Sequence, residues 1–342
     1  MPKPLASLSL DLDNKWSYMK THGDAGWDSY PTYLDTVVPR FLKTCHERDT
    51  HMTVFVVGQD ASREENFEAL ASISAAGHEI GSHSFKHEPW LHLYSEAELV
   101  SELAVTEEHL ERVTGQCPIG FRGPGFSFTE TLLQVMVRRG YRYDCSTFPT
   151  FLGPLARLYY FMSTRLDKGQ REERKELFGR FSEGFRPLRP FQWKFADGEL
   201  TEIPVTTMPF IKSPIHASYI LYLAQFSQLA AKTYWKLAVS MCRATGIAPS
   251  LLLHPLDFMG CDDDSDLSFF PAMGRPAEPK IELVGWMIDE MKKHWDVRPM
   301  KDHAEAVAAQ FVPASESKAL LGDAKKSGVP VPQTSMHSTE EV

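Results

Sequence analysis

Residues 5–13 read Leu-Ala-Ser-Leu-Ser-Leu-Asp-Leu-Asp and form the stretch that decides the fold. Leu8, Leu10 and Leu12 are spaced two residues apart and fall on one face of an extended strand, because successive side chains point to opposite sides. Asp11 and Asp13 are also two residues apart, so both carboxylates point to the same side at the end of the strand. The stretch predicts a strand that directs two carboxylates at one site, although an aspartate here would also suit a turn or a helix cap.

Short apolar runs alternate with helical patterns along the rest of the chain. Further strands are expected at residues 52–57, 78–82, 119–121, 141–144, 200–206 and 250–253. Helices are expected at residues 33–47, 64–76, 130–139, 219–245 and 281–294, with one more that starts at Ser95 and has Glu98 in a capping-box position. Alternating strands and helices imply parallel strand pairing and an α/β fold. About seven such units predict a distorted (β/α)7-type barrel, with its chemistry at the C-terminal ends of the strands.

The barrel is expected to occupy residues 1–312 as one domain of the 342-residue chain. Residues 150–199 interrupt the alternation and are rich in phenylalanine, arginine and proline, which predicts a helical and aromatic insertion over one end of the barrel. Residues 313–342 are rich in serine, proline, lysine and threonine and have few large apolar side chains. This composition predicts a disordered C-terminal tail.

Composition excludes some classes of protein. The chain has 36 Lys and Arg against 45 Asp and Glu, a net charge of −9, which argues against a nucleic-acid partner because phosphate contacts need a basic face. The five cysteines are scattered without zinc or redox spacing, so reduced thiols in the cytoplasm are expected. No export signal is recognisable at the N-terminus, and the uncharged stretch at residues 213–231 contains His and Gln side chains that disfavour a membrane-spanning helix.

Two histidines, His83 and His87, follow the strand expected at residues 78–82. In a helical turn a spacing of four places both imidazoles on one face, as in zinc-binding pairs. The glutamate of the zinc-protease motif is missing, and a pair among 13 histidines can also arise by chance. Together with a strand-end aspartate, two histidines would form a metal site that leaves positions open for water and substrate.

Two further motifs come directly after expected strands. Residues 122–126 read Arg-Gly-Pro-Gly-Phe, where an arginine beside carboxylates can fix one of them in the ionised state and the glycines let the backbone approach a ligand. The same letters also encode a plain turn. Residues 251–255 read Leu-Leu-Leu-His-Pro, a strand that ends in a histidine suited to general acid catalysis or to a hydrogen-bonded place in the core.

The four motifs Asp-x-Asp, Gly-Ser-His-x-x-x-His, Arg-Gly-Pro-Gly-Phe and Leu-Leu-His-Pro, in this order, resemble the polysaccharide deacetylase family. This is the NodB-homology fold of carbohydrate esterase family 4, and the resemblance covers residues 5–299. It implies that Asp11 is the catalytic base, that Arg122 orients Asp11, and that His254 is the acid.

The resemblance also implies a metal and a substrate pocket. A divalent ion, with zinc favoured and cobalt or nickel as substitutes, would be bound by Asp13, His83 and His87. The substrate-binding residues implied are Pro124 and Gly125, Phe126 with its backbone N–H facing the oxyanion, and Leu252 lining the pocket for the acetyl methyl.

The chain departs from the family pattern in two places. No clear match exists for the Asp-x-x-Trp motif, which usually supplies a partner for the acid histidine, and residues 150–199 exceed the usual barrel connection. The Asp-x-Asp form is similar to a subgroup that holds some peptidoglycan deacetylase-like and deformylase-like members.

These residues predict a metal-dependent hydrolase that removes an N-acyl group, above all N-acetyl, from an amino-sugar-containing glycan or glycolipid precursor. A deformylase or cyclic-amide hydrolase on the same fold is one alternative. A non-catalytic carbohydrate-binding module is another, but it predicts losses among the catalytic positions, and none is found.

The insertion at residues 150–199 mixes aromatic and basic side chains in an otherwise acidic chain. This mixture predicts peripheral contact with the cytoplasmic face of a membrane, or a groove for a phosphorylated or lipid-linked glycan. The alternative is that the aromatic side chains simply cover the barrel end. Residues 262–266 are rich in aspartate but lack the glycine and glutamate of a calcium loop, so a solvated acidic loop at the barrel rim is expected.

Overall fold

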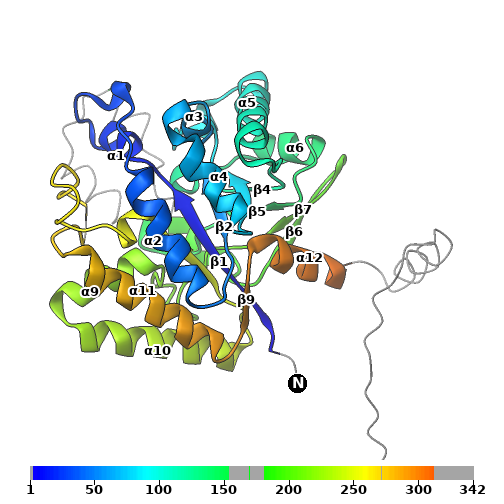
Figure 1. Ribbon diagram of the computed structural model, residues 1–342. Helices are drawn as coiled ribbons and strands as arrows, with labels where there is room; N and C mark the ends of the chain where they lie inside the picture. The colour runs from blue at the N-terminus through cyan, green and yellow to red at the C-terminus, as the bar shows by residue number, and fades with distance from the viewer. Residues whose placement is uncertain (1–2, 154–168, 170–180, 271, 312–342) are drawn as a thin grey trace, which may run out of the picture.

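Strand β1, Leu5–Leu12, has the bounds expected from the sequence and pairs with three other strands, β2, β8 and β9. The computed structural model describes residues 3–153, 169, 181–270 and 272–311. The expected tail at 313–342 and most of the expected helical insertion lie outside these described residues. Figure 1 shows β1 running through the middle of the molecule with helices packed around it.

The sheet has nine strands in the order β6-β7-β5-β4-β3-β2-β1-β8, and β9 also pairs with β1. The strands after β1 are β2 (Thr53–Val56), β3 (Glu79–Ser82), β4 (Gly120–Phe121), β5 (Tyr143–Asp144), β6 (Phe191–Phe195), β7 (Gly198–Glu202), β8 (Ser250–Leu253) and β9 (Asp296–Arg298). All pairings are parallel except the antiparallel pair of β6 with β7.

Two hydrogen bonds join the β7 side of the curled sheet to β8. Beyond the end of β7, the backbone N–H of Thr206 donates to the Ser250 carbonyl of β8 (3.2 Å), and the Ser250 N–H donates to Thr206 Oγ1 (2.8 Å). Between these two sides the strands β8, β1, β2, β3, β4, β5 and β7 run parallel. The structure therefore confirms the α/β class and the distorted (β/α)7-type barrel.

The helices surround this sheet. Their bounds are α1 (Lys15–His22), α2 (Leu34–His46), α3 (Gly58–Ala61), α4 (Phe67–Ala75), α5 (Glu96–Thr114), α6 (Glu130–Arg138), α9 (Ala217–Phe226), α10 (Gln228–Thr245), α11 (Ala277–Lys292) and α12 (Met300–Phe311). The capping box expected at the start of α5 is present, because the Ser95 and Glu98 side chains each bond the other residue's backbone N–H. The single helix expected at residues 219–245 is instead two helices.

Ser227 separates α9 from α10. Its backbone is extended (φ −160°, ψ 114°), and its hydroxyl accepts a hydrogen bond from the Ala230 N–H (3.2 Å), which starts α10. Serine is an effective N-cap, but the apolar pattern continues through it, so periodicity alone predicted one helix where the cap makes two.

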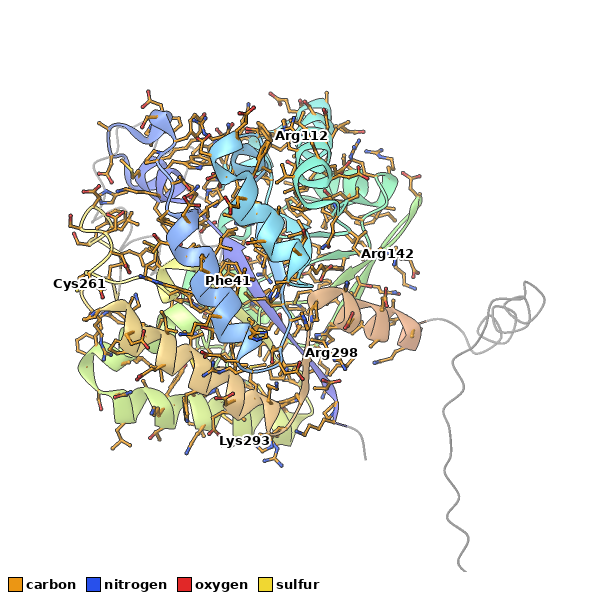
Figure 2. All side chains as sticks on the ribbon, viewed as in Figure 1. Phe41, Arg112, Arg142, Cys261, Lys293 and Arg298 are labelled. Atoms are coloured by element: carbon orange, nitrogen blue, oxygen red, sulfur yellow. The ribbon has the colours of Figure 1, made fainter. Side chains whose placement is uncertain are left out.

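The two faces of β1 have different chemistry. Leu8, Leu10 and Leu12 are buried in the main hydrophobic core, together with side chains of the surrounding helices such as Phe41. Figure 2 labels Phe41 on α2 near the centre of the molecule, while the labelled Arg142 and Lys293 lie at its periphery. The alternate residues of β1 are polar and face the barrel interior, where they meet partners from distant strands.

The last residues of the expected insertion belong to the sheet. β6 pairs with β7 from Phe191 opposite Glu202 to Phe195 opposite Gly198. The sequence Phe-Gln-Trp-Lys-Phe alternates aromatic and polar side chains, which is typical of a strand. Among the described residues the sheet resumes at Phe191, so the predicted end of the insertion at residue 199 lies too far along the chain.

The acidic loop at residues 262–266 exposes Asp262 and Asp266 to solvent as expected, but its other two aspartates are paired with cations. The Asp263 carboxylate accepts two hydrogen bonds from the Arg40 guanidinium, both 2.6 Å long, and Lys15 Nζ lies 2.8 Å from Asp264 Oδ2. These cations come from α1 and α2, so the loop is held against the barrel rim by ion pairs that no local sequence pattern predicts.

Two expectations about membrane spans and thiols can be compared with the structure. Within residues 3–311, apart from the gaps noted above, no helix has both the length and the hydropathy of a membrane span. All five cysteines lie in the described residues, and each is a free thiol.

Two buried carboxyl groups face each other across paired strands, Asp144 on β5 and Glu202 on β7. Burial raises the pKa of both, and for Glu202 the charge of Asp144 and their mutual hydrogen bond raise it further. The pair therefore shares a proton in the folded state, with Glu202 as its carrier. Ser146 Oγ and Trp193 Nε1 donate to the remaining oxygens at 2.7 and 2.9 Å.

Glu202→Gln should flatten the dependence of stability on pH. The unfolded chain loses these protons at lower pH than the folded pair does. The contribution of the pair to the free energy of unfolding is therefore fully present in acid and falls as pH rises through that interval, by about 1.4 kcal/mol per proton and pH unit. Differential scanning calorimetry between about pH 5 and pH 8 should show a smaller fall in Tm for the variant. Glu199→Gln, on the exposed edge of the same strand, is the matched control; equal slopes for all three proteins would contradict a shared proton.

Candidate metal and hydrolytic site

Strand register brings the candidate residues to one edge of the barrel. Leu12 pairs with Val56, and Val56 pairs with Ser82, so the residues that follow these strands lie at the same level. Asp13 follows β1, and His83 follows β3. Strand β2 lies between these two strands and pairs with both. Because the strands are parallel, this level is the C-terminal edge of the sheet, where barrel chemistry is expected.

The side chains of Asp13, His83 and His87 converge there. Asp13 Oδ1 lies 3.2 Å from His83 Nε2 and 2.8 Å from His87 Nε2, and one ligand atom of each residue lies within 4.8 Å of the others. The side chains are 12%, 3% and 10% exposed in that order. Despite these short distances, Asp13 Oδ1 has no hydrogen-bond partner, so neither imidazole directs an N–H at it.

This arrangement fits a divalent metal ion. Three ligand atoms, two of nitrogen and one of oxygen, point at a common position without hydrogen bonds among them, which is the donor set of open zinc sites. Burial raises the pKa of Asp13, but the electrostatic interactions with His87 and His83 prevail and hold it well below its usual range. The carboxylate is therefore ionised, as a metal ligand must be.

The His83 ring is oriented by the backbone. Its Nδ1 lies 2.7 Å from the Arg122 carbonyl, which can only accept, so Nδ1 carries the proton and Nε2 presents a lone pair to the site. This contact crosses from β3 to β4, so the same element that carries the arginine also fixes the histidine.

His87 reaches the site through a strained loop rather than the expected helical turn. Ser84 and His87 have positive φ values of 60° and 52°, a conformation that non-glycine residues seldom adopt. The Glu102 carboxylate of α5 stabilises the loop by accepting hydrogen bonds from the backbone N–H groups of Phe85 (2.9 Å) and Lys86 (2.7 Å). The spacing of four was thus correctly singled out, but its geometric reason was wrong.

A buried aspartate supports the site from outside, and sequence analysis missed it. Asp60 Oδ1 accepts hydrogen bonds of 2.8 Å from both Asn14 Nδ2 and Trp16 Nε1. The Trp16 ring packs edge-on against His87 at 6.4 Å between centroids. Burial raises the pKa of Asp60 to about 7. Its segment, Gly-Gln-Asp-Ala, has no recognisable motif, so only the fold reveals this role.

Asp11 lies in a buried ion pair with Arg122. Arg122 Nη1 donates to Asp11 Oδ1 (2.7 Å) and to Ser9 Oγ (2.9 Å), while its Nε donates to the Cys145 carbonyl (3.1 Å). The guanidinium lies 4.5 Å from the centre of the Phe55 ring and is fully buried. The predicted contact between these two residues is therefore present, and it fixes the direction of the Asp11 carboxylate.

The glycine-rich loop after β4 forms a single tight turn over Pro124–Phe126. A side chain at Gly123 would meet the Ser127 carbonyl oxygen at 1.9 Å, so glycine is required there. Pro124 is buried, whereas Gly125 and Phe126 are partly exposed. The Phe126 N–H donates to the Gly123 carbonyl (2.9 Å), which corrects the expectation that it faces an oxyanion: in this structure the turn itself uses that donor.

His254 and Leu252 come from β8. Leu253 pairs with Leu10, so His254, the next residue, lies level with Asp11. Leu252 is buried and pairs with Ser9, which places it on the interior face of the sheet rather than in the outer core with Leu253. Both positions suit the roles predicted from the motifs, which stay predictions.

A second histidine, unnoticed in the sequence, lies beside His254. The ring of His216 is 6.0 Å from that of His254, and its Nδ1 is buried without a hydrogen-bond partner. Burial and the neighbouring His254 lower the pKa of His216 to about 3, so it is neutral at physiological pH.

Comparison with known families confirms the resemblance seen in the motifs. The family model described as polysaccharide deacetylase matches residues 24–143. The matched range contains His83, His87 and Arg122, while Asp11 and His254 lie outside it and join the site through the fold. Residues 24–143 are thus similar in sequence to the polysaccharide deacetylase family.

Two curated relatives are deacetylases. A peptidoglycan deacetylase of Helicobacter pylori is 29% identical over 148 residues, which are 42% of this chain and 49% of that protein. A chitin deacetylase of Colletotrichum lindemuthianum is 32% identical over 102 residues, which are 28% of this chain and 41% of that protein. The chain therefore spans less than half the length of either relative.

A solved structure shows the same fold over nearly the whole chain. It is the crystal structure of a Mycobacterium smegmatis protein that carries the name polysaccharide deacetylase, 21% identical with a TM-score of 0.59. The match covers 92% of this chain and 93% of that one. At this level of identity the comparison establishes the architecture.

Metal binding should distinguish the two aspartates of β1. Metal-free protein titrated with Zn²⁺ in a calorimeter should bind about one ion per chain, because the part of the chain that the structure describes holds one three-ligand cluster. Asp13→Asn should weaken binding by about tenfold or more, since an amide is a neutral, poorer ligand. Asp11→Asn, on the same strand, is the matched control and should bind normally. Equal affinity in both variants would show that Asp13 is not a ligand.

Proposed function

We propose that the protein is a metal-dependent hydrolase that removes an N-acyl group, above all N-acetyl, from an amino-sugar-containing glycan. The observation that carries the proposal is the Asp11–Arg122 pair directly beside the Asp13, His83 and His87 cluster. It places an oriented carboxylate two residues from a metal ligand, which is the combination that hydrolysis of an amide requires. The deacetylase relatives support the substrate class.

A divalent ion held by Asp13, His83 and His87 would supply an activated water and polarise the acyl carbonyl. Asp11 would accept a proton from the attacking water. The buried guanidinium of Arg122 donates a hydrogen bond to the Asp11 carboxylate and keeps it in one orientation, so the base is positioned before substrate binds.

His254 would donate a proton to the departing amine. This step is needed because an amine leaves as a neutral molecule only if its nitrogen is protonated. Its place at the end of β8, level with Asp11, puts an acid and a base on neighbouring strands of the same edge. His216 stays neutral, so it does not oppose a positive charge on His254.

The deformylase and cyclic-amide alternatives use the same residues and differ only in the substrate. The non-catalytic alternative is disfavoured because the oriented carboxylate, the ligand cluster and the strand-end histidine are all present at one edge. A panel of acetylated, formylated and cyclic amides therefore separates these possibilities better than any single substrate.

Asp11→Asn should reduce turnover by about two to four orders of magnitude, the usual contribution of a general base. The measurement is release of acetate or formate from N-acylated sugars, chitin oligomers, peptidoglycan fragments and lipid-linked glycans, with Zn²⁺ present. Asp264→Asn, a rim aspartate paired with Lys15, is the control and should keep nearly full activity. No acyl release by the wild type from any member of the panel would refute the proposal.

An exposed apolar surface adjoins the site. We name it the rim patch, and its members are Leu152, Phe181, Phe185, Phe210 and Ile211. The Phe151 ring contacts Phe181 (5.0 Å) and Phe185 (5.2 Å). Phe210 and Ile211 are 79% and 62% exposed.

Hydrogen bonds join the segments of the rim patch to one another, and a ring contact connects them to the glycine-rich loop. Thr150 Oγ1 donates to the Lys212 carbonyl (2.8 Å), and Lys212 Nζ donates to the Arg186 carbonyl (2.6 Å). Two residues before Thr150, the Phe148 ring stacks on Phe126 at 4.7 Å. The rim patch and its flanking cations therefore continue directly into the site.

We infer that the rim patch contacts an anionic lipid surface, which would make a lipid-linked glycan accessible to the site. Large apolar side chains beside Lys212 and Arg186, in a chain of net charge −9, suit the boundary between acyl chains and anionic headgroups. Most of the basic residues that first suggested this contact lie outside the described residues. A cytoplasmic location at the membrane surface is part of the same proposal.

Vesicle co-sedimentation tests this contact. The double variant Phe210→Glu, Ile211→Glu should lose binding to phosphatidylserine vesicles, because charges replace the side chains that would enter the headgroup region. Phe311→Glu at the end of α12, also on an exposed phenylalanine, should bind as the wild type does. If the wild type does not sediment with vesicles, the patch has no lipid role, whatever the acyl-release assay shows.

A further inference from the structure

His254 has two hydrogen-bond partners that its motif does not predict. Its Nδ1 lies 3.1 Å from Ser218 Oγ on α9, and its backbone N–H donates to Asp257 Oδ2 (2.8 Å). The Ser218 hydroxyl is also hydrogen-bonded to the Asp257 carboxylate. Ser218 and Asp257 are both buried, whereas His254 is partly exposed at the strand edge.

The direction of this chain follows from its chemistry. A carboxylate only accepts, so the Ser218 hydroxyl donates its proton to Asp257. The Ser218 oxygen can then accept a hydrogen bond from the N–H at His254 Nδ1. This order places the Nδ1 proton toward the protein interior and leaves Nε2 as the nitrogen that can carry a proton to or from a ligand.

We propose that Ser218 and Asp257 act as a relay that orients the His254 ring and stabilises its protonated form. Ser218 is a positioning residue that contacts the ring, and Asp257 acts through it. The inference rests on the proposed function only in taking His254 as the acid; the relay itself is a statement about hydrogen bonds. It supplies the partner that the absent Asp-x-x-Trp motif left unassigned.

The charged and titratable groups around His254 agree with this role. His216 on α9 is neutral, and burial keeps the pKa of Tyr18 on α1 well above its usual value. Lys280 on α11 is buried, donates to the Leu256 and Met259 carbonyls (2.6 Å each), and its charge favours an ionised Asp257. Asp11 on the neighbouring strand is paired with its own guanidinium and is not part of the relay.

Asp257 is a buried carboxyl group with several close partners. Burial raises the pKa of Asp257 above its usual value, while the charge of His254 and the hydrogen bonds from Ser218 and the His254 N–H act in the opposite direction. A buried carboxylate with three such partners is stable only while they stay in place, so the relay also holds the turn after β8 together.

The first measurement is the pH profile of kcat/KM for acyl release by the full-length zinc-loaded protein. Asp257→Asn should lower the rate about tenfold and move the alkaline limb to lower pH by about one unit, because the negative charge behind the imidazolium is lost. Ser218→Ala should have a similar effect, and Ser218→Thr, which keeps the hydroxyl, should restore most of the activity. Ser213→Ala, five residues earlier, is the matched control. If a variant loses the same fraction of kcat/KM at every pH and its alkaline limb does not move, the residue has a structural role alone.

The second measurement does not depend on activity. Imidazole ¹⁵N chemical shifts of histidine-labelled protein, assigned with His254→Gln, report which ring nitrogen carries the proton. The wild type should have neutral His254 protonated on Nδ1, and Ser218→Ala should shift the population toward the Nε2 form. Thermal unfolding confirms that each variant is folded.

The two measurements separate the two proposals. A wild-type ring protonated on Nε2, or a tautomer unchanged in Ser218→Ala, would overturn the relay even if the enzyme is active. An Nδ1-protonated ring in a protein that releases no acyl group would keep the relay and overturn the proposed function instead.

Discussion

The ion pair between Arg122 and Asp11 is the constraint on which the site depends. A guanidinium buried in a barrel is stable only with a charged partner and further acceptors, because an unpaired buried charge costs several kcal/mol. Its donors reach β1 and the residue after β5, while its own carbonyl accepts from His83. One residue thus ties the candidate base, one candidate metal ligand and three strands into a single unit.

The candidate metal ligands are positioned by two different means. Strand register alone brings Asp13 and His83 to the same level, because both follow parallel strands whose pairing is set by their buried apolar faces. His87 depends on a loop whose positive φ values are maintained by Glu102. The strand-derived half of the cluster is intrinsically rigid, whereas the loop-derived half stores strain that the surrounding hydrogen bonds must offset.

The sequence predicted the parts of the structure that local pattern controls. β1, β8 and the capping box of α5 occur at the expected residues, and the candidate residues of the four motifs meet at one edge. The helix break at Ser227 escaped notice because apolar periodicity continues through it. The oxyanion contact of the Phe126 N–H was predicted from the motif, whereas the geometry of the turn, which uses this N–H, is visible only in the structure.

Partners that lie far apart in the chain could not be predicted in the same way. Asp60 contacts residues more than 40 positions earlier, and Ser218 contacts a histidine 36 positions later. Such pairs leave no periodic trace in one sequence, because a hydrogen bond constrains only two side chains. Supporting residues of this kind are therefore the part of a site that structure adds to sequence.

The join between Thr206 and Ser250 gives the barrel an uneven mechanical character. Ladders of four residue pairs join β1 to β8, β1 to β2 and β2 to β3, whereas two hydrogen bonds between Thr206 and Ser250 close the ring between β7 and β8. A seam of this kind opens at lower free energy than a ladder does. The chain leaving Thr206 leads to the rim patch and then to Ser218, so the seam lies on the side of the barrel that carries His254. The seam can yield there without disturbing the four-pair ladders that position Asp13 and His83.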